Sequence, residues 1–92
     1  MRVALVARGS VQGVGFRPSV VRLAMEGGLV GWVRNAPAGV QIQAQGLAAA
    51  VDIFVAGIEA LPRPAHVAEL TRECIGPVDG EDRFVIRESD QE

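Results

Sequence analysis

The segment VQIQAQ, residues 40–45, alternates apolar and polar side chains without a break. Val40, Ile42 and Ala44 fall on one face of an extended chain and the glutamines on the other, because side chains along a β-strand point alternately to opposite faces. A strand with one apolar face needs a second layer to cover that face. The fold is therefore expected to contain a sheet that is covered on one side and wet on the other.

Two segments carry helical patterns that suit this second layer. The first helix is predicted at residues 17–26, because Pro18 is tolerated in a first helical turn and a pair of glycines follows as a stop signal. The second is predicted from apolar residues that recur at helical spacing over residues 47–61. Both helices are expected to pack on the dry face of the sheet.

The remaining apolar runs predict strands at residues 2–8, 29–36 and 65–75, and a short closing strand at 83–89. With the alternating strand they give the order strand, helix, strand, strand, helix, strand, and a possible fifth strand. This order is typical of the ferredoxin-like, or split βαβ, fold, an α+β arrangement with an antiparallel sheet and two helices on one face. A chain of 92 residues with 49% hydrophobic residues is expected to form a single domain, residues 1–92.

Charge and composition argue against several classes of function. The net charge of -2 disfavours nucleic-acid binding, which needs a surplus of basic residues on one face. No stretch approaches the roughly 20 apolar residues of a membrane span, and the N-terminal run is too short for a signal peptide. The single cysteine, Cys74, makes no internal disulfide, and the chain has no CxxC pair for zinc. We expect a cytoplasmic protein with no metal or other cofactor in this domain, and no nucleic-acid or membrane partner.

The segment RGSVQGVGFRP, residues 8–18, joins the first predicted strand to the first predicted helix. Its glycines accept the dihedral angles of a concave nest of backbone N–H groups, and a helix start adds the positive end of its dipole. Such a nest favours phosphate or a similar anion, and Arg17 is placed to close over it. The same glycines would also serve a plain strand-to-helix turn, and the residues alone leave both interpretations open. The lysine of a P-loop is absent.

Two motifs together, GSVQGVGFR and GWVRN, closely resemble the signature pair of the acylphosphatase family, and the resemblance runs over nearly all of the chain. It implies that Arg17 binds phosphoryl oxygens and that Asn35 orients the attacking water. Hydrolysis of an acyl phosphate would then rest on positioning and charge stabilisation, with the substrate's own phosphate as proton acceptor. The resemblance also implies a phosphoryl cradle made by the backbone of consecutive residues, namely Gln12, Gly13, Val14, Gly15, Phe16 and Arg17.

Further details narrow the resemblance. Pro18 follows Arg17 directly, Ala38 stands in the hairpin turn where an Asp before the glycine is common, and the chain closes with RFVIRESD. These features resemble the N-terminal acylphosphatase-like domain of the HypF family, the carbamoyltransferases that mature nickel-iron hydrogenases. That resemblance implies carbamoyl phosphate as the substrate. Its implied partners are downstream domains of a larger protein, of which this chain would be a fragment, and a maturation protein that accepts the carbamoyl group.

Two other functions stay open at this point. The chain could be a free-standing acylphosphatase of broad substrate range, or a phosphate-binding or docking module without turnover. Arg8 and Arg34 could add positive charge around the glycine loop or lie on the surface. Trp32 is expected to be a packing residue, Cys74 a small apolar residue in a strand, and His66 a structural or surface residue.

Overall fold

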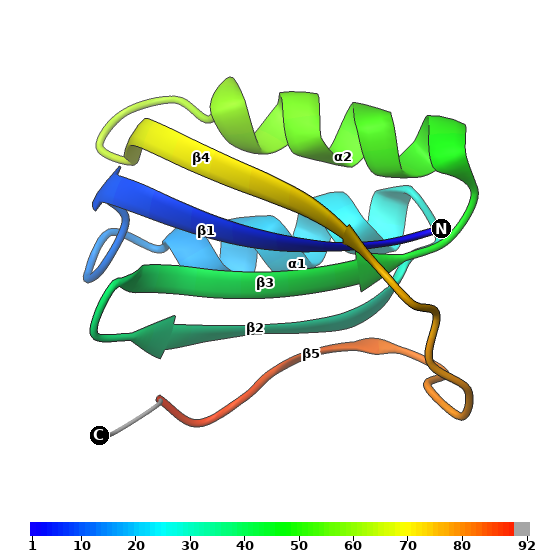
Figure 1. The fold of residues 1–92 in the computed structure, drawn as a ribbon. Coiled ribbons are helices and arrows are strands. Elements are labelled where there is room, and N and C mark those ends of the chain that lie inside the picture. The colour runs from blue at the N-terminus through cyan, green and yellow to red at the C-terminus, as the bar shows by residue number, and fades with distance from the viewer. Residues whose placement is uncertain (90–92) are drawn as a thin grey trace.

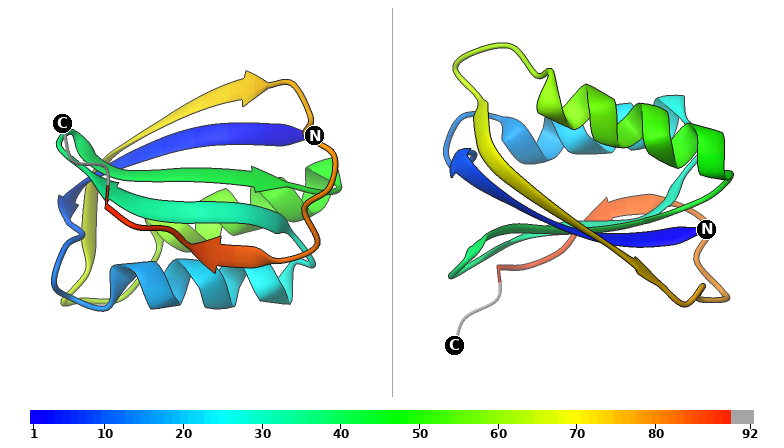
Figure 2. Two further views of the ribbon diagram at one scale, coloured as in Figure 1. Left: turned by 90° about the horizontal axis from the view of Figure 1, so that it is seen from below. Right: turned by 45° about the horizontal axis from the view of Figure 1, so that its top comes forward.

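The computed structural model describes residues 1–89, so the last three residues of the predicted domain lie outside it. A five-stranded sheet forms one layer, and two helices cover one of its faces (Figures 1 and 2). This is the ferredoxin-like α+β architecture expected from the sequence. The elements in chain order are β1 (Arg2–Ser10), α1 (Phe16–Glu26), β2 (Val30–Ala36), β3 (Gly39–Gln45), α2 (Ala48–Glu59), β4 (His66–Ile75) and β5 (Phe84–Ile86).

The strand order is β4-β1-β3-β2-β5. β1 pairs antiparallel with β3 and β4, and β2 pairs antiparallel with β3. β5 instead runs parallel to β2, so the sheet is mixed and the expected antiparallel pairing is wrong at this edge. β4 ends at the end of the sheet where β2 begins, and a loop that turns round this end must enter β5 in the direction of β2. The predicted closing strand, residues 83–89, is also shorter, at Phe84–Ile86.

The covered face is the apolar face that the alternation predicts. Val40, Ile42 and Ala44 are all buried under the helices, together with the apolar residues of β1. Phe54 of α2 meets Phe84 of β5 edge-on, with ring centroids 6.0 Å apart. The short fifth strand is therefore part of the core, although it pairs with only one neighbour. No helix within residues 1–89 is long and apolar enough to cross a membrane.

The uncovered face carries a polar network around Arg2, whose side chain is only 2% exposed. The Arg2 guanidinium donates to Oε1 of Gln43 at 2.9 Å, to Oε1 of Gln45 at 3.2 Å and to the carboxylate of Glu81 at 2.6 Å. Gln45 also bonds both backbone groups of Val78, at 2.8 and 3.0 Å. These bonds tie the loop between β4 and β5 to the sheet. They explain why glutamines on the wet face are only partly exposed.

Glu81→Gln is expected to lower the free energy of unfolding by about 1–3 kcal/mol, because it removes the counter-ion of a buried guanidinium. The matched control is Asp82→Asn, since the Arg83–Asp82 pair is 76% and 84% exposed and pairs of this kind contribute less than about 1 kcal/mol. Urea denaturation of both variants measures the difference. Equal stabilities would contradict a stabilising role for the Arg2–Glu81 pair.

Trp32 lies on the same uncovered face and is buried there by two arginines, as expected of a packing residue. The guanidinium carbons of Arg34 and Arg87 lie 5.0 and 4.8 Å from the centroid of its ring. At these distances the face of an indole attracts a cation. Arg34 also donates to Oε1 of Gln41 at 2.8 Å. The Arg34 side chain therefore packs on the uncovered face of the sheet.

Candidate active site

The glycine loop between β1 and α1 lies at the same end of the sheet as the turn between β2 and β3 (Figure 1). Val11 and Phe16 are buried and anchor the two ends of the loop in the core. Between them Gln12, Gly13 and Gly15 are exposed. The loop is thus fixed at its ends while its middle faces solvent.

Gly13 and Gly15 both have a φ angle of 75°, in the left-handed region that favours glycine. A Cβ placed on either residue would meet no atom of the described chain within 4 Å. The backbone conformation, and not a lack of space, therefore sets the need for glycine. Left-handed residues of this kind turn successive N–H groups toward one point and form an anion-binding concavity.

The first turn of α1 has backbone donors that bond to no residue within the described range 1–89. Gly15 is the N-cap residue and has no side chain to cap the helix. The first helical bond runs from the N–H of Ser19 to the carbonyl of Gly15, at 3.3 Å, and Pro18 has no N–H. No described residue accepts a hydrogen bond from the backbone N–H groups of Phe16 and Arg17. These donors, with the positive end of the helix dipole behind them, suit an anion.

Arg17 is half-buried in the first turn of α1. It forms neither a hydrogen bond nor an ion pair with any residue that the structure describes. A guanidinium presents a planar fork of donors, which matches the oxygens of a phosphoryl group. An unpaired arginine at the start of this helix completes a positive pole at the end of the loop.

Asn35 lies near the end of β2, and alternation with buried Val33 turns its side chain toward the helices. Its Oδ1 atom is buried and has no hydrogen-bond partner, and it is the one such side-chain atom within residues 1–89. Leaving a buried acceptor unsatisfied costs about 1–3 kcal/mol. The protein thus keeps this oxygen without a partner at a cost in stability, which points to a role for Asn35 other than packing.

The register of the sheet relates Asn35 to the glycine loop. Asn35 lies opposite Val40 on β3, and Val40 lies opposite Ala7 on β1. The three residues form a row across the sheet, close to the point where β1 leads into the loop. Two strand spacings, about 10 Å, separate Asn35 from Ala7 along this row. The fold thus brings Asn35 to the end of the sheet that carries the loop and Arg17.

A hollow of about 460 Å³ opens beside the glycine loop, between the loop and the β2–β3 turn. It is lined by residues 8–12, Val14 and the turn residues 37–39. Of these, Arg8 is the one with a charged side chain. In the sequence, Arg8 can be seen to border the glycine loop because it directly precedes Gly9. That the turn at residues 37–39 forms the opposite wall is shown only by the fold.

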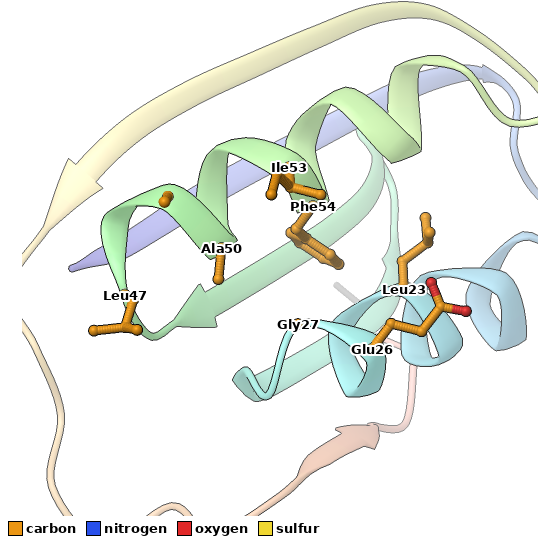
Figure 3. Close-up of a pocket in the computed structure, with 8 residues that line it drawn as sticks. Leu23, Glu26, Gly27, Leu47, Ala50, Ile53 and Phe54 are labelled. Atoms are coloured by element: carbon orange, nitrogen blue, oxygen red, sulfur yellow. The ribbon is translucent and has the colours of Figure 1, made fainter.

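A second hollow, about 410 Å³, lies between the end of α1 and the start of α2, away from the glycine loop (Figure 3). Its walls are mainly apolar, with Leu23, Leu47, Ile53 and Phe54, and Glu26 stands at its edge. An apolar groove with a carboxylate beside it does not suit a phosphoryl group. The candidate site is therefore the loop end of the sheet.

Within residues 1–89, no cluster of three or more His, Cys, Asp or Glu side chains is placed to hold a metal ion. His66 is the exposed first residue of β4, which agrees with a surface role. Cys74 lies on the same strand, as expected, but its side chain is exposed. β4 is an edge strand, and this explains its limited cover.

Comparison of the chain with known proteins shows its family. The acylphosphatase family model matches residues 3–86, so the chain belongs to the acylphosphatase family. The carbamoyltransferase HypF2 of Cupriavidus necator is 52% identical over 91 residues, which cover 97% of this chain and 11% of that protein. The chain thus spans a small part of the length of this relative.

Two solved structures, an acylphosphatase and a full-length HypF, are similar to this chain. The acylphosphatase from Bacillus subtilis matches with a TM-score of 0.87 and 32% identity, over 94% of this chain and 97% of that one. Full-length HypF in its phosphate- and nucleotide-bound form matches with a TM-score of 0.87 and 28% identity, over 97% of this chain and 12% of that one. This chain is therefore similar to nearly the whole of one protein and to a small part of the other.

Proposed function

We propose that the chain hydrolyses acyl phosphates at the loop end of the sheet. The observation that carries this proposal is the glycine loop, which leads into Arg17, an arginine without a partner among residues 1–89, at the end of the sheet where β2 brings Asn35. The backbone N–H groups of residues 12–17 and the Arg17 guanidinium hold the phosphoryl oxygens. The Asn35 amide orients water for in-line attack.

The proposed reaction needs one bond to form and one to break. The water oxygen attacks phosphorus, and the bond from phosphorus to the acyl oxygen breaks, so that a carboxylate leaves with the electron pair. The water proton passes to a phosphoryl oxygen of the substrate. Arg17 and the N–H groups stabilise the charge that is spread over the phosphoryl oxygens. The proposal assigns no metal or other cofactor to this domain.

We further infer that the natural substrate is carbamoyl phosphate, and that the domain works within a carbamoyltransferase of hydrogenase maturation. The support is the similarity to HypF2 over nearly the whole chain, together with Pro18 after Arg17. The partners in this proposal are downstream domains and the maturation protein that accepts the carbamoyl group. The proposed location is the cytoplasm.

A side-by-side assay of carbamoyl phosphate and acetyl phosphate with the purified chain tests this function. We expect both to be hydrolysed, with kcat/KM about fivefold higher for carbamoyl phosphate, because its amide adds one well-placed hydrogen bond worth roughly 1 kcal/mol. Phenyl phosphate, an ester with a poor leaving group, is the negative control. Equal values for the two acyl phosphates would favour a broad-range acylphosphatase. Phosphate binding without turnover would favour a docking module.

A further inference from the structure

We propose that Arg8 stabilises the carboxylate that leaves during hydrolysis, and that the hollow beside the glycine loop receives this group. The inference rests on the proposed function, because it concerns the second product of the same reaction. It gives this reaction a second cation, apart from Arg17, and a separate place for the acyl group.

The lining of the hollow suits a small anionic group. Gln12 and Val14 belong both to the proposed phosphoryl cradle and to the wall of the hollow, so an acyl group bonded to the phosphorus has room to extend into it. The opposite wall is the turn Pro37-Ala38-Gly39, which carries no ionisable side chain. Among the lining residues a carboxylate would therefore meet one charged side chain, Arg8, which it would share with Glu69 of β4.

Arg8 lines the hollow with its stem beside the turn, while one end of its guanidinium is held by β4. Its Nη1 donates to Oε1 of Glu69 on β4 at 2.9 Å, and the two side chains are 45% and 60% exposed. A Cβ built on Gly39 would lie 3.2 Å from Cγ of Arg8, so the absence of a side chain at Gly39 leaves room for the arginine stem beside the turn. The other N–H groups of the guanidinium donate to no residue that the structure describes.

The chemistry gives this cation a role that Arg17 does not fill. In the proposed reaction Arg17 and the loop N–H groups bind the phosphoryl oxygens. The acyl oxygen gains negative charge as its bond to phosphorus breaks, and a hydrogen bond from a guanidinium strengthens with that charge. Arg8 therefore favours the transition state over the bound substrate, and most strongly for a basic carboxylate. Its effect should appear in how the rate depends on the leaving group.

A series of ring-substituted benzoyl phosphates tests this role, because the substituent changes the basicity of the leaving benzoate. For Arg8→Gln we expect a steeper fall of log kcat/KM with the pKa of the leaving group than for the wild type. The loss should be about tenfold for the most basic benzoate and slight for the least basic. Arg8→Lys should keep a slope close to that of the wild type. The matched control is Arg22→Gln, an exposed arginine of α1 outside the hollow, which should leave the line unchanged.

A second measurement uses the wild-type chain and does not depend on a variant that folds. Acetate is titrated at saturating phosphate while the Nε–H signals of the arginines are followed by NMR. We expect the Arg8 signal to shift and the Arg22 signal to stay in place. An unmoved Arg8 signal, or equal slopes for Arg8→Gln and wild type, would overturn the role of Arg8 and leave the proposed function intact. A folded wild type that hydrolyses no benzoyl phosphate would overturn both.

Discussion

Arg17→Ala is expected to lower kcat/KM for acyl phosphates by about 10³-fold or more and to weaken phosphate binding as well. Its guanidinium has no partner among the described residues, and Arg17 belongs to the first turn of α1. Removing one preorganised donor from a charge-stabilising site costs about 10²–10³-fold, and an arginine that binds phosphoryl oxygens contributes 10³-fold or more. Steady-state kinetics and calorimetry with inorganic phosphate measure the two effects.

Two matched variants separate charge from geometry at this position. Arg17→Lys keeps the positive charge but loses the planar fork, so we expect it to recover part of the phosphate affinity and little of the rate. Arg22→Ala, on the exposed part of the same helix, should leave both unchanged. If folded Arg17→Ala retained a tenth of the wild-type activity, the phosphoryl group would have to bind elsewhere.

Asn35→Ala is expected to lower kcat by about 10²–10³-fold while phosphate affinity stays within about twofold. In the proposed mechanism its amide orients the attacking water and does not bind the phosphoryl group, so the loss falls on the step that needs oriented water. The variant also removes a buried acceptor that has no partner within residues 1–89, so we expect no loss of stability in urea. Kinetics, phosphate calorimetry and denaturation of one variant give these three readouts.

The pattern of the three readouts for Asn35→Ala distinguishes the candidate functions. A loss of phosphate affinity in step with the rate would make Asn35 an anion ligand. Unchanged turnover would contradict its role as the water-orienting residue. Asn35→Asp is the useful comparison, because a carboxylate of similar size should repel the phosphoryl group and weaken phosphate binding, which the alanine variant should not do.

Most of the fold follows from local patterns. The alternation over residues 40–45 and the helical spacing over 47–61 are each complete within one segment, so they predict the layers and the covered face. The direction of β5 could not be predicted in this way, because a strand of three residues carries no useful periodicity. Its pairing depends on the route of the preceding loop. The burial of Arg2 likewise depends on Glu81, which is remote in sequence.

In the candidate site, too, some residues could be predicted from the sequence, and other features depend on the fold. Arg17 and Asn35 stand out because their motifs resemble those of a family, and their roles remain predictions. The unpartnered state of Oδ1 in Asn35 depends on what the neighbouring strands and helices place around it, which no local motif encodes. The place of Arg8 in the hollow depends on the approach of the turn at residues 37–39 to the glycine loop.

The interior position of β1 in the sheet links the site to the order in which the chain is synthesised. Its two neighbours, β3 and β4, are both made later, and β4 ends only at Ile75. A nascent chain therefore carries β1 with both edges unpaired until β3 has left the ribosome, and with its β4 edge unpaired until most of the domain has done so. Gly9, at the start of the glycine loop, pairs with Val67 of β4. A loop synthesised early thus receives its support late, and a ribosome-bound chain that stops before β4 should not form the site.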